Sequence, residues 1–327
     1  MDLLEPMRGE NSTSVTKFIL LGLSSNLQEQ LILFGVFTAI YMVALMDNVL
    51  ILPLISLDSR LHTLMYFLLG NLSVVDIGYI SSTMPKMLAN YLLQDKSISW
   101  AFCLTQMFFF ISFGGIECLL LGVMAYDRYV VICHPLHYGT VMNSRACVQM
   151  AASAWINGSL NSSLHTGNTF ALTFCGGNMV DQFFCEIPKL LKLACSDSYL
   201  SEVQVLTFSA CLGLSCFILI TFSYVQIFKT VLRIPSEQGC HKAFSTCLPH
   251  LIVVSLFRSC VELALSIAGT KGPMLREEEK NRSLGMLYSA VSPVINLLIY
   301  NLRNKEIKEA LNKILDKIVF SKRRFSS

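Results

Sequence analysis

Residues 127–129 read Asp-Arg-Tyr and carry the most distinctive chemistry of the chain, at the end of a long apolar stretch. A guanidinium beside a carboxylate can be held by it or can move to another partner, and conformational switches use charge contacts of this two-position kind. The simpler interpretation is an arginine that reaches from a membrane edge into water. An isolated triplet favours the simpler interpretation, so the surrounding sequence has to decide.

Two further acids, Asp76 and Glu117, lie within other apolar stretches. An ionisable group inside a membrane is costly, so it is by default a functional hypothesis. Two carboxylates that face one cavity need a cation or a shared proton. The alternative is that one of the two acids is simply protonated.

Seven apolar stretches must position these residues. The chain has 327 residues, of which 53% are hydrophobic and 14% are charged, whereas about one-quarter of an ordinary soluble domain is charged. About 20 apolar residues form a helix that crosses the roughly 30 Å hydrocarbon layer, and the in/out alternation of barrel strands is missing. The sequence predicts an all-α membrane protein, a seven-transmembrane helix bundle, with spans near 30–56, 62–90, 98–132, 146–170, 200–232, 243–268 and 283–302.

The distribution of Lys and Arg predicts the orientation of this bundle in the plasma membrane. Positive charge is retained on the cytoplasmic side of short loops, which favours an extracellular segment 1–28, a bundle over 29–302 and a cytoplasmic helix and tail over 303–327. The net charge of +3 reflects this bias and no nucleic-acid patch. The first 25 residues lack the pattern of a cleaved signal peptide. Asn11 is therefore expected outside, as a glycosylation acceptor in Asn-Ser-Thr.

The end of the chain has apolar residues at near-helical spacing between Lys and Arg, from residue 301 to residue 317. This pattern predicts a short amphipathic C-terminal helix that lies on the inner membrane surface. Anionic lipid is the expected partner.

Four of the twelve cysteines fall at the expected outer face, namely Cys103, Cys175, Cys185 and Cys195. An oxidising exterior permits them to pair, and the residues alone leave the pairing open. No cysteine or histidine cluster has the spacing of a zinc site.

The string Met-Ala-Tyr-Asp-Arg-Tyr-Val-Val-Ile-Cys-His-Pro-Leu-His-Tyr at 124–138 closely resembles the signature of the vertebrate olfactory (odorant) receptors, in the rhodopsin-like (class A) superfamily of G-protein-coupled receptors. Further matches cover nearly the whole chain: residues 64–68, Leu72-Ser73 with Asp76, Ser223-Tyr224, residues 242–247 and residues 293–306. The resemblance implies disulfides between Cys103 and Cys185 and between Cys175 and Cys195. It also implies that Asp76 and Glu117 face the bundle interior, where a sodium ion could bridge them.

The same resemblance implies the activity and its switch. A small volatile odorant would bind in the outer half of the bundle, and the chain would activate a stimulatory, olfactory-type heterotrimeric G protein and so raise cAMP. Release of Arg128 from Asp127 would then allow contact with the G protein, in a site completed by Tyr129, Tyr224 and Tyr300.

A mostly apolar cavity with a few polar groups suits a small odorant. The third stretch offers Phe110, Ile111, Gly114, Gly115 and Cys118 on adjoining helical faces, and its glycines are expected to leave room. The resemblance adds residues from the later stretches: Phe208, Leu212, Arg258, Val261, Glu262, Leu265, Met286 and Ser289. Each residue alone is more often ordinary helix packing than a ligand contact.

Arg258 departs from the family pattern, which usually has an aromatic residue there. A lone Arg in a span costs at least about 2.5 to 3.5 kcal/mol on insertion scales, and Glu262 lies four residues further along the same helical face. We predict that the pair forms a polar wall of the cavity that favours ligands with a carboxylate, carbonyl or hydroxyl group. A closed, purely structural pair is equally compatible.

Leu297 stands where the family usually has Pro, and Leu64 is a second such departure, so a signalling-impaired olfactory receptor stays an alternative. A non-olfactory class A receptor is another. An enzyme is not expected, because no nucleophile is matched with a base or a metal site. A transporter would show internal repeats or broken helices in matching halves, which the sequence lacks.

Overall fold

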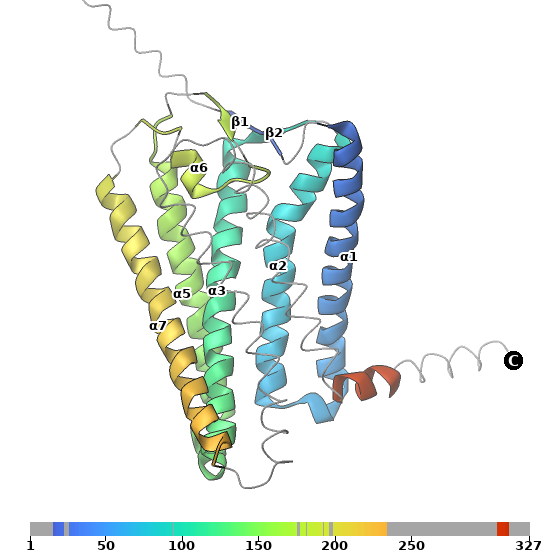
Figure 1. The fold of residues 1–327 in the computed structure, drawn as a ribbon, viewed down its shortest axis with the longest axis vertical. Coiled ribbons are helices and arrows are strands. Elements are labelled where there is room, and N and C mark those ends of the chain that lie inside the picture. Colours follow the sequence, from blue (N-terminus) through green and yellow to red (C-terminus); the bar gives the residue numbers. More distant parts are fainter. Residues whose placement is uncertain are drawn as a thin grey trace, which may run out of the picture.

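A computed structural model of the chain describes residues 16–22, 26–93, 95–174, 177–180, 182–191, 193–195, 199–233 and 306–313. Five long helices run side by side in this part of the chain (Figure 1). They are α1 (Leu27–Leu57), α2 (Leu64–Leu93), α3 (Trp100–Cys133), α5 (Ser144–Phe170) and α7 (Tyr199–Val231). Each agrees within a few residues with a predicted span, and the predicted spans 243–268 and 283–302 lie outside the described residues.

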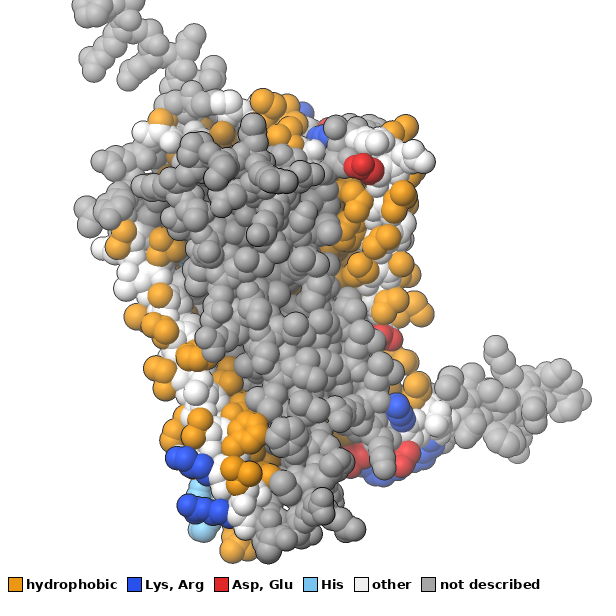
Figure 2. Space-filling model, in the orientation of Figure 1, with side chains coloured by type: hydrophobic (Ala, Val, Ile, Leu, Met, Phe, Trp, Pro, Cys, Tyr) orange, Lys and Arg blue, Asp and Glu red, His pale blue; other side chains and the backbone are white. Residues whose placement is uncertain are grey.

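Four of these helices are long and apolar enough to cross a membrane: α1, α2, α3 and the Val203–Val231 part of α7. Hydrophobic side chains cover the two flanks formed by α7 and α1 in Figure 2. Leu31 and Met46 on α1 and Leu214 and Ile218 on α7 are among the exposed ones. Apolar side chains that stay exposed along whole helices suit contact with lipid, because nothing in water would favour them there.

The predicted span at 146–170 forms the helix α5, but the prediction that this span is apolar was wrong. It falls short of the hydropathy of the other four helices because it is rich in Ser, Asn, Gly and Thr. Several of these polar groups bond to neighbouring helices: Ser159 Oγ lies 3.2 Å from Ser112 Oγ, and Ser162 Oγ donates to the Phe108 carbonyl at 2.5 Å. Polar contacts between helices satisfy groups that lipid could not.

Side chains cap the starts of three long helices. Asn26 accepts from the Gln28 amide at the start of α1, Ser99 from the Phe102 amide at α3, and Asn143 from the Ala146 amide at α5. Short helical turns complete the described connections: η1 (Ser59–Leu61), η2 (Pro135–His137), α4 (Tyr138–Val141) and α6 (Ile187–Leu191).

A small three-stranded sheet at one end of the mostly helical bundle was not predicted (Figure 1). Strand β1 (Lys17–Leu20) lies between β2 (Ser97–Ser99), to which it is antiparallel, and β3 (Met179–Val180), to which it is parallel. Phe18 and Leu20 of β1 are buried in a cluster with Ile98 and Val180. The sheet joins the start of the chain to two loops between helices, and so caps this end of the bundle.

Helix α3 packs against α2, α5 and α7 and is the central element of the described bundle. Two glycines allow its close contacts. The ring of Phe113 lies 2.4 Å from the position that a Cβ of Gly78 on α2 would take, and Ile116 lies 2.6 Å from that of Gly158 on α5. A side chain at either glycine would push α3 away from its neighbour.

Residues 306–313 are helical, and they are the only described part of the predicted helix 301–317. They lie at the opposite end from the sheet, near the turn between α1 and α2 (Figure 1). Ile307 and Ala310 are buried in the core cluster of the bundle. Tyr66 donates to Glu306 Oε2 at 2.6 Å, and Arg60 pairs with Glu309 at 3.2 Å.

Candidate functional site

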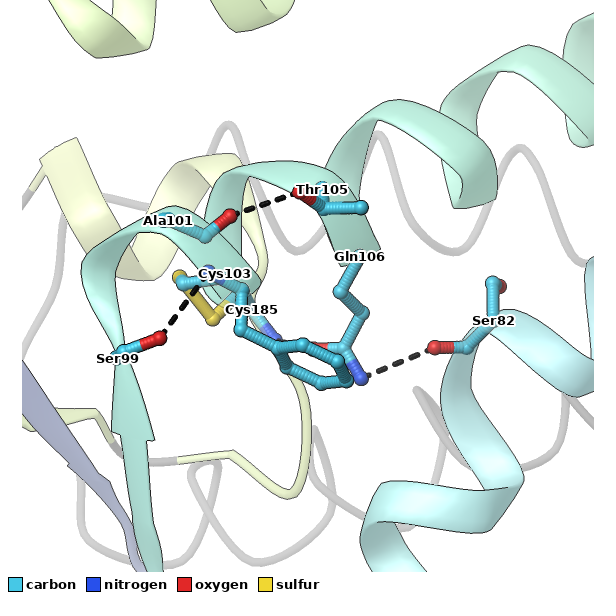
Figure 3. Close-up of a disulfide and its surroundings, with 8 residues drawn as sticks. Ser82, Ser99, Ala101, Cys103, Thr105, Gln106 and Cys185 are labelled. Atoms are coloured by element: carbon cyan, nitrogen blue, oxygen red, sulfur yellow. Dashed lines mark hydrogen bonds between the residues drawn. A yellow bond between two sulfur atoms is a disulfide. The ribbon is translucent and has the colours of Figure 1, made fainter.

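A disulfide joins Cys103 at the start of α3 to Cys185 in the segment that follows β3, as the resemblance implied (Figure 3). Cys195 is disulfide-bonded as well. Its expected partner Cys175 lies outside the described residues. The Cys103–Cys185 bond holds the loop that follows α5 against the start of α3.

Gln106, one turn after Cys103, forms a polar clamp that the sequence analysis missed. Its side chain is buried, its Nε2 donates to the Ser82 carbonyl of α2 at 3.1 Å, and its Oε1 accepts from the Cys185 amide at 3.0 Å (Figure 3). One side chain therefore ties α2, α3 and the disulfide loop together. The available signal was an amide in an apolar run, one helical turn from a cysteine.

The predicted pocket residue Phe110 lies within an aromatic stack just below this loop. Its ring is 4.8 Å from that of Tyr79 on α2 and 5.0 Å from that of Phe184, measured between centroids. Ile111 packs against the buried cluster under the sheet. Phe110 and Ile111 therefore both lie against the sheet and the disulfide-linked loop, which cover this part of α3.

The expectation that Gly114 and Gly115 leave room for a ligand was wrong. A Cβ on Gly114 would lie 3.2 Å from the Tyr79 ring, and a Cβ on Gly115 would lie 3.4 Å from the Cα of Gly158. The neighbouring helices already occupy the space that the missing side chains leave. These glycines serve close helix packing, which is a common use of small residues between membrane helices.

Other predicted pocket residues are only partly described. Cys118 on α3 and Phe208 and Leu212 on α7 are half-buried. The remaining six lie outside the described residues, so their place in a pocket stays a prediction: Arg258, Val261, Glu262, Leu265, Met286 and Ser289.

Three side chains linked by hydrogen bonds join α5 to α7 next to Phe208, and the sequence analysis did not predict them. Ser209 Oγ donates to Asn161 Oδ1 at 2.8 Å and lies 2.7 Å from His165 Nε2. Because the serine proton goes to Asn161, His165 Nε2 must supply the other proton. These hydrogen bonds join the two helices in the half of the bundle that is nearer the sheet.

Asp76 on α2 and Glu117 on α3 are both buried, with 1% and 0% of their surface exposed. Within the described residues, no group of three or more His, Cys, Asp or Glu side chains could hold a metal ion. A cation at these two acids would therefore need other oxygen ligands.

At the end of the bundle away from the sheet, Asp127 accepts a hydrogen bond from the hydroxyl of Tyr138 on α4 at 2.9 Å. Burial, with the Asp127 carboxylate beside it, raises the pKa of the Tyr138 phenol well above its usual range. The phenol therefore stays protonated and can donate.

Arg128 does not pair with Asp127. Its guanidinium instead donates to the sulfur of Met65 on α2, and no ion pair joins it to Asp127 in the described part of the chain. This corrects the expected contact between the two residues, because adjacent side chains on a helix point in different directions.

Tyr129 and Tyr224, which the sequence analysis assigned to one switch, belong to one packed cluster. Tyr224 on α7 is buried with Ala125 of α3, and Tyr129 packs against this cluster. Tyr129 also lies 2.9 Å from His134 Nε2 through its hydroxyl. Tyr300 and the glycosylation acceptor Asn11 lie outside the described residues and stay predictions.

Comparison with known proteins gives a match over most of the chain. The family model described as olfactory receptor matches residues 37–317. The chain is 46% identical to olfactory receptor 2A25 of Homo sapiens, over 94% of this chain and 98% of that protein. It is 45% identical to olfactory receptor 1G1 of Gorilla gorilla gorilla (94% and 97% covered) and 44% identical to olfactory receptor 5AP2 of Mus musculus (96% and 98% covered). The chain therefore belongs to the olfactory receptor family, and it is a membrane receptor and not an enzyme.

Proposed function

We propose that this protein is an odorant receptor that binds small volatile molecules in the outer half of a seven-helix bundle and activates a stimulatory, olfactory-type heterotrimeric G protein. The observation that carries the proposal is the family match over residues 37–317, which includes the Asp127-Arg128-Tyr129 motif and the outer cysteines. A rise in cAMP would be the cellular output.

The described outer half supports the ligand part of this proposal. The packed rings of Tyr79, Phe110 and Phe184 make this region apolar, and odorant pockets need mostly apolar walls with a few polar groups. Arg258 and Glu262 are proposed to supply those polar groups. Ligands with a carboxylate, carbonyl or hydroxyl group would then be preferred.

Helix α3 supports a link between the two ends. Phe110 and Arg128 lie on the same helix, about 27 Å apart at 1.5 Å per residue. A ligand shifts a conformational equilibrium only by its difference in affinity between the two states. We propose that the active state releases Arg128 from Met65, and that Arg128, Tyr129, Tyr224 and Tyr300 then form the surface that the G protein binds.

The proposed orientation places the sheet and the disulfides outside the cell, because disulfides persist in oxidising surroundings. Residues 306–313 would then lie on the cytoplasmic side, with anionic lipid as a partner. Epitope tags at the two ends test this orientation in intact cells. Antibody should reach the N-terminal tag without permeabilisation and the C-terminal tag only after it, and staining of both tags in intact cells would refute the orientation.

Sodium is proposed as an ion bound at Asp76 and Glu117. Their burial suits a group that needs a cation or a proton. Sodium would neutralise this buried charge and favour the resting arrangement of α2 and α3.

A signalling-impaired receptor of the same family is the second candidate. Leu297 and Leu64 stand at positions where the resemblance led us to expect proline, and proline weakens helix backbone where it occurs. The same assay separates the two candidates.

A cAMP reporter in cells that carry the olfactory-type stimulatory G protein, challenged with a panel of volatile compounds, is that assay. We expect at least one compound to raise cAMP in the wild type, and no response from Arg128→Ala at equal surface expression. A silent wild-type receptor at normal surface expression would favour the impaired candidate. Equal responses from the wild type and Arg128→Ala would refute the proposed switch.

A further inference from the structure

A small cavity lies where the end of β1 meets the outer end of α2. Its volume is about 10 Å³, and the residues that line it are Leu20, Leu21, Gly22, Met87, Asn90, Tyr91, Lys96 and Phe183. A cavity of roughly 10 to 15 Å³ is the smallest that holds one water molecule, provided that two to four polar partners surround it. The polar partners therefore decide whether this cavity can hold a molecule.

Asn90 lines the cavity, and its side-chain acceptor has no donor among the described residues. The residue is 8% exposed, and its Oδ1 atom is buried without a hydrogen-bond partner in the described part of the chain. A buried acceptor left without a donor is destabilising. Because Asn90 lines the cavity, a donor inside the cavity could reach its side-chain oxygen.

Lys96 supplies the complementary group. Its Nζ donates to the Leu21 carbonyl at 3.2 Å, and an ammonium has three donors in all. The cavity thus presents spare donors from Lys96, an acceptor on Asn90 and the carbonyl of Leu21, which has a second lone pair. Tyr91 adds a buried hydroxyl, which can both donate and accept, and the remaining lining is mostly apolar.

We propose that this cavity is a binding site for one water molecule that accepts from Lys96 and donates to Asn90 Oδ1 and to the Leu21 carbonyl. Three hydrogen bonds are typical of a buried water. An anion would face two carbonyl oxygens, and a metal cation would face the ammonium of Lys96. Only a small neutral molecule that both donates and accepts matches the whole set.

The bound water connects three segments at the end of the bundle that carries the sheet. It links the end of β1 through Leu21, the outer end of α2 through Asn90, and the segment before β2 through Lys96. The backbone in this region is also joined directly, since the Leu20 amide donates to the Lys96 carbonyl at 2.8 Å and the Leu21 amide to the Val180 carbonyl at 3.0 Å. The water therefore holds the N-terminal strand on the bundle.

Hydrogen exchange of the Leu20, Leu21 and Gly22 amides in the purified full-length receptor tests the site. The leucine side chain of Asn90→Leu is nearly as large as that of asparagine but has no acceptor. Asn90→Asp keeps an acceptor, and the ammonium of Lys96 attracts its carboxylate. Thr83→Val is the matched control, because Thr83 Oγ1 is likewise buried without a described partner but does not line this cavity. Replacing a dry orphan polar group by an apolar one is neutral or stabilising.

We expect Asn90→Leu to speed exchange of these amides about five-fold, the effect of losing one hydrogen bond, while Asn90→Asp and Thr83→Val leave it unchanged. Unchanged or slower exchange in Asn90→Leu would mean that the cavity is dry and would overturn the proposal. Faster exchange in Asn90→Asp as well, or in all three variants, would overturn it too, because packing rather than an acceptor would then be the cause.

Discussion

Replacing Gly158 with alanine would place a methyl group inside the contact between α5 and α3. The new Cβ would lie 2.6 Å from Ile116 Cγ1, 2.9 Å from the Ile116 nitrogen and 3.1 Å from the Ser112 carbonyl oxygen. Two of these three atoms belong to the backbone of α3 and cannot move as a side chain can. The helices must therefore separate, and the polar contacts between them must lengthen.

Overpacking of this kind costs about 1 to 3 kcal/mol. Alanine also raises helix propensity by about 1 kcal/mol relative to glycine, so a control has to cancel that gain. Gly167→Ala is this control, because Gly167 lies on the same helix with nothing within 4 Å of its added Cβ. The difference between the two variants then reports the contact alone, and it corresponds to about a five-fold to hundred-fold change in the folded-to-unfolded ratio.

Thermal unfolding of the purified receptor measures this difference, with a thiol-reactive dye that reports exposure of buried free cysteines such as Cys147. We expect Gly158→Ala to unfold at a lower temperature than the wild type, and Gly167→Ala to unfold at the same temperature or higher. Equal midpoints for the two variants would refute the conclusion that the glycine is required by close packing of α3.

Three further predictions follow from contacts at the two ends and in the middle of the bundle. Gln106→Glu keeps the acceptor for the Cys185 amide but, when ionised, loses the donor to the Ser82 carbonyl. It should lower odorant potency in dose–response curves by about ten-fold, whereas Thr105→Ala on the same helix should not; unchanged potency would exclude a role for the clamp. Hydrogen bonds from Arg60 lower the pKa of Asp58 below its ordinary value of 3.8, so the stabilising contact is present above that value and is lost as the pH falls through the lowered pKa. Lys313 Nζ lies 3.8 Å from the same carboxylate, so exchange of residues 306–313 should speed up on acidification below about pH 4, and by more in the wild type than in Asp58→Asn, where only Glu306 and Glu309 still titrate. Equal pH responses in the two proteins would contradict this assignment. Sodium should reduce agonist-free cAMP signalling in the wild type but not in Asp76→Asn, and equal sodium effects would exclude an ion at this acid.

The sequence predicted the long helices well because hydrophobic runs of membrane length have few alternative structures. α1, α2, α3 and α7 begin and end within a few residues of their predicted limits. Side-chain caps such as Asn26 and Ser99 account for the starts of α1 and α3. Apolar runs and capping residues are local features of the sequence, so they can be recognised without knowledge of the tertiary structure.

The features that the sequence did not predict depend on neighbours that are distant in the chain. The four residues of β1 become a strand only because residues 97–99 and 179–180 lie beside them. The role of Gly115 follows from Gly158, and that of Gln106 from Cys185. The periodicity of a helix shows which residues share a face but not which helix covers that face.

The contacts of Asp127 and Arg128 at the proposed switch show the same limit of prediction from sequence. Adjacent residues Asp127 and Arg128 suggested a pair, but adjacent side chains on a helix point in different directions. Tyr138 and Met65 therefore take their places as partners. The switch role of the motif stays a prediction, while the contacts of its residues required the structure.

The central claim, that an odorant in the outer half of the bundle controls Arg128 at the inner end, is tested most directly by odorant-stimulated nucleotide exchange on the purified stimulatory G protein. We expect the purified wild-type receptor to accelerate exchange when an active odorant is added. Arg128→Ala should bind the same odorant with similar affinity and leave exchange at its basal rate. Acceleration by Arg128→Ala equal to that of the wild type would contradict the claim.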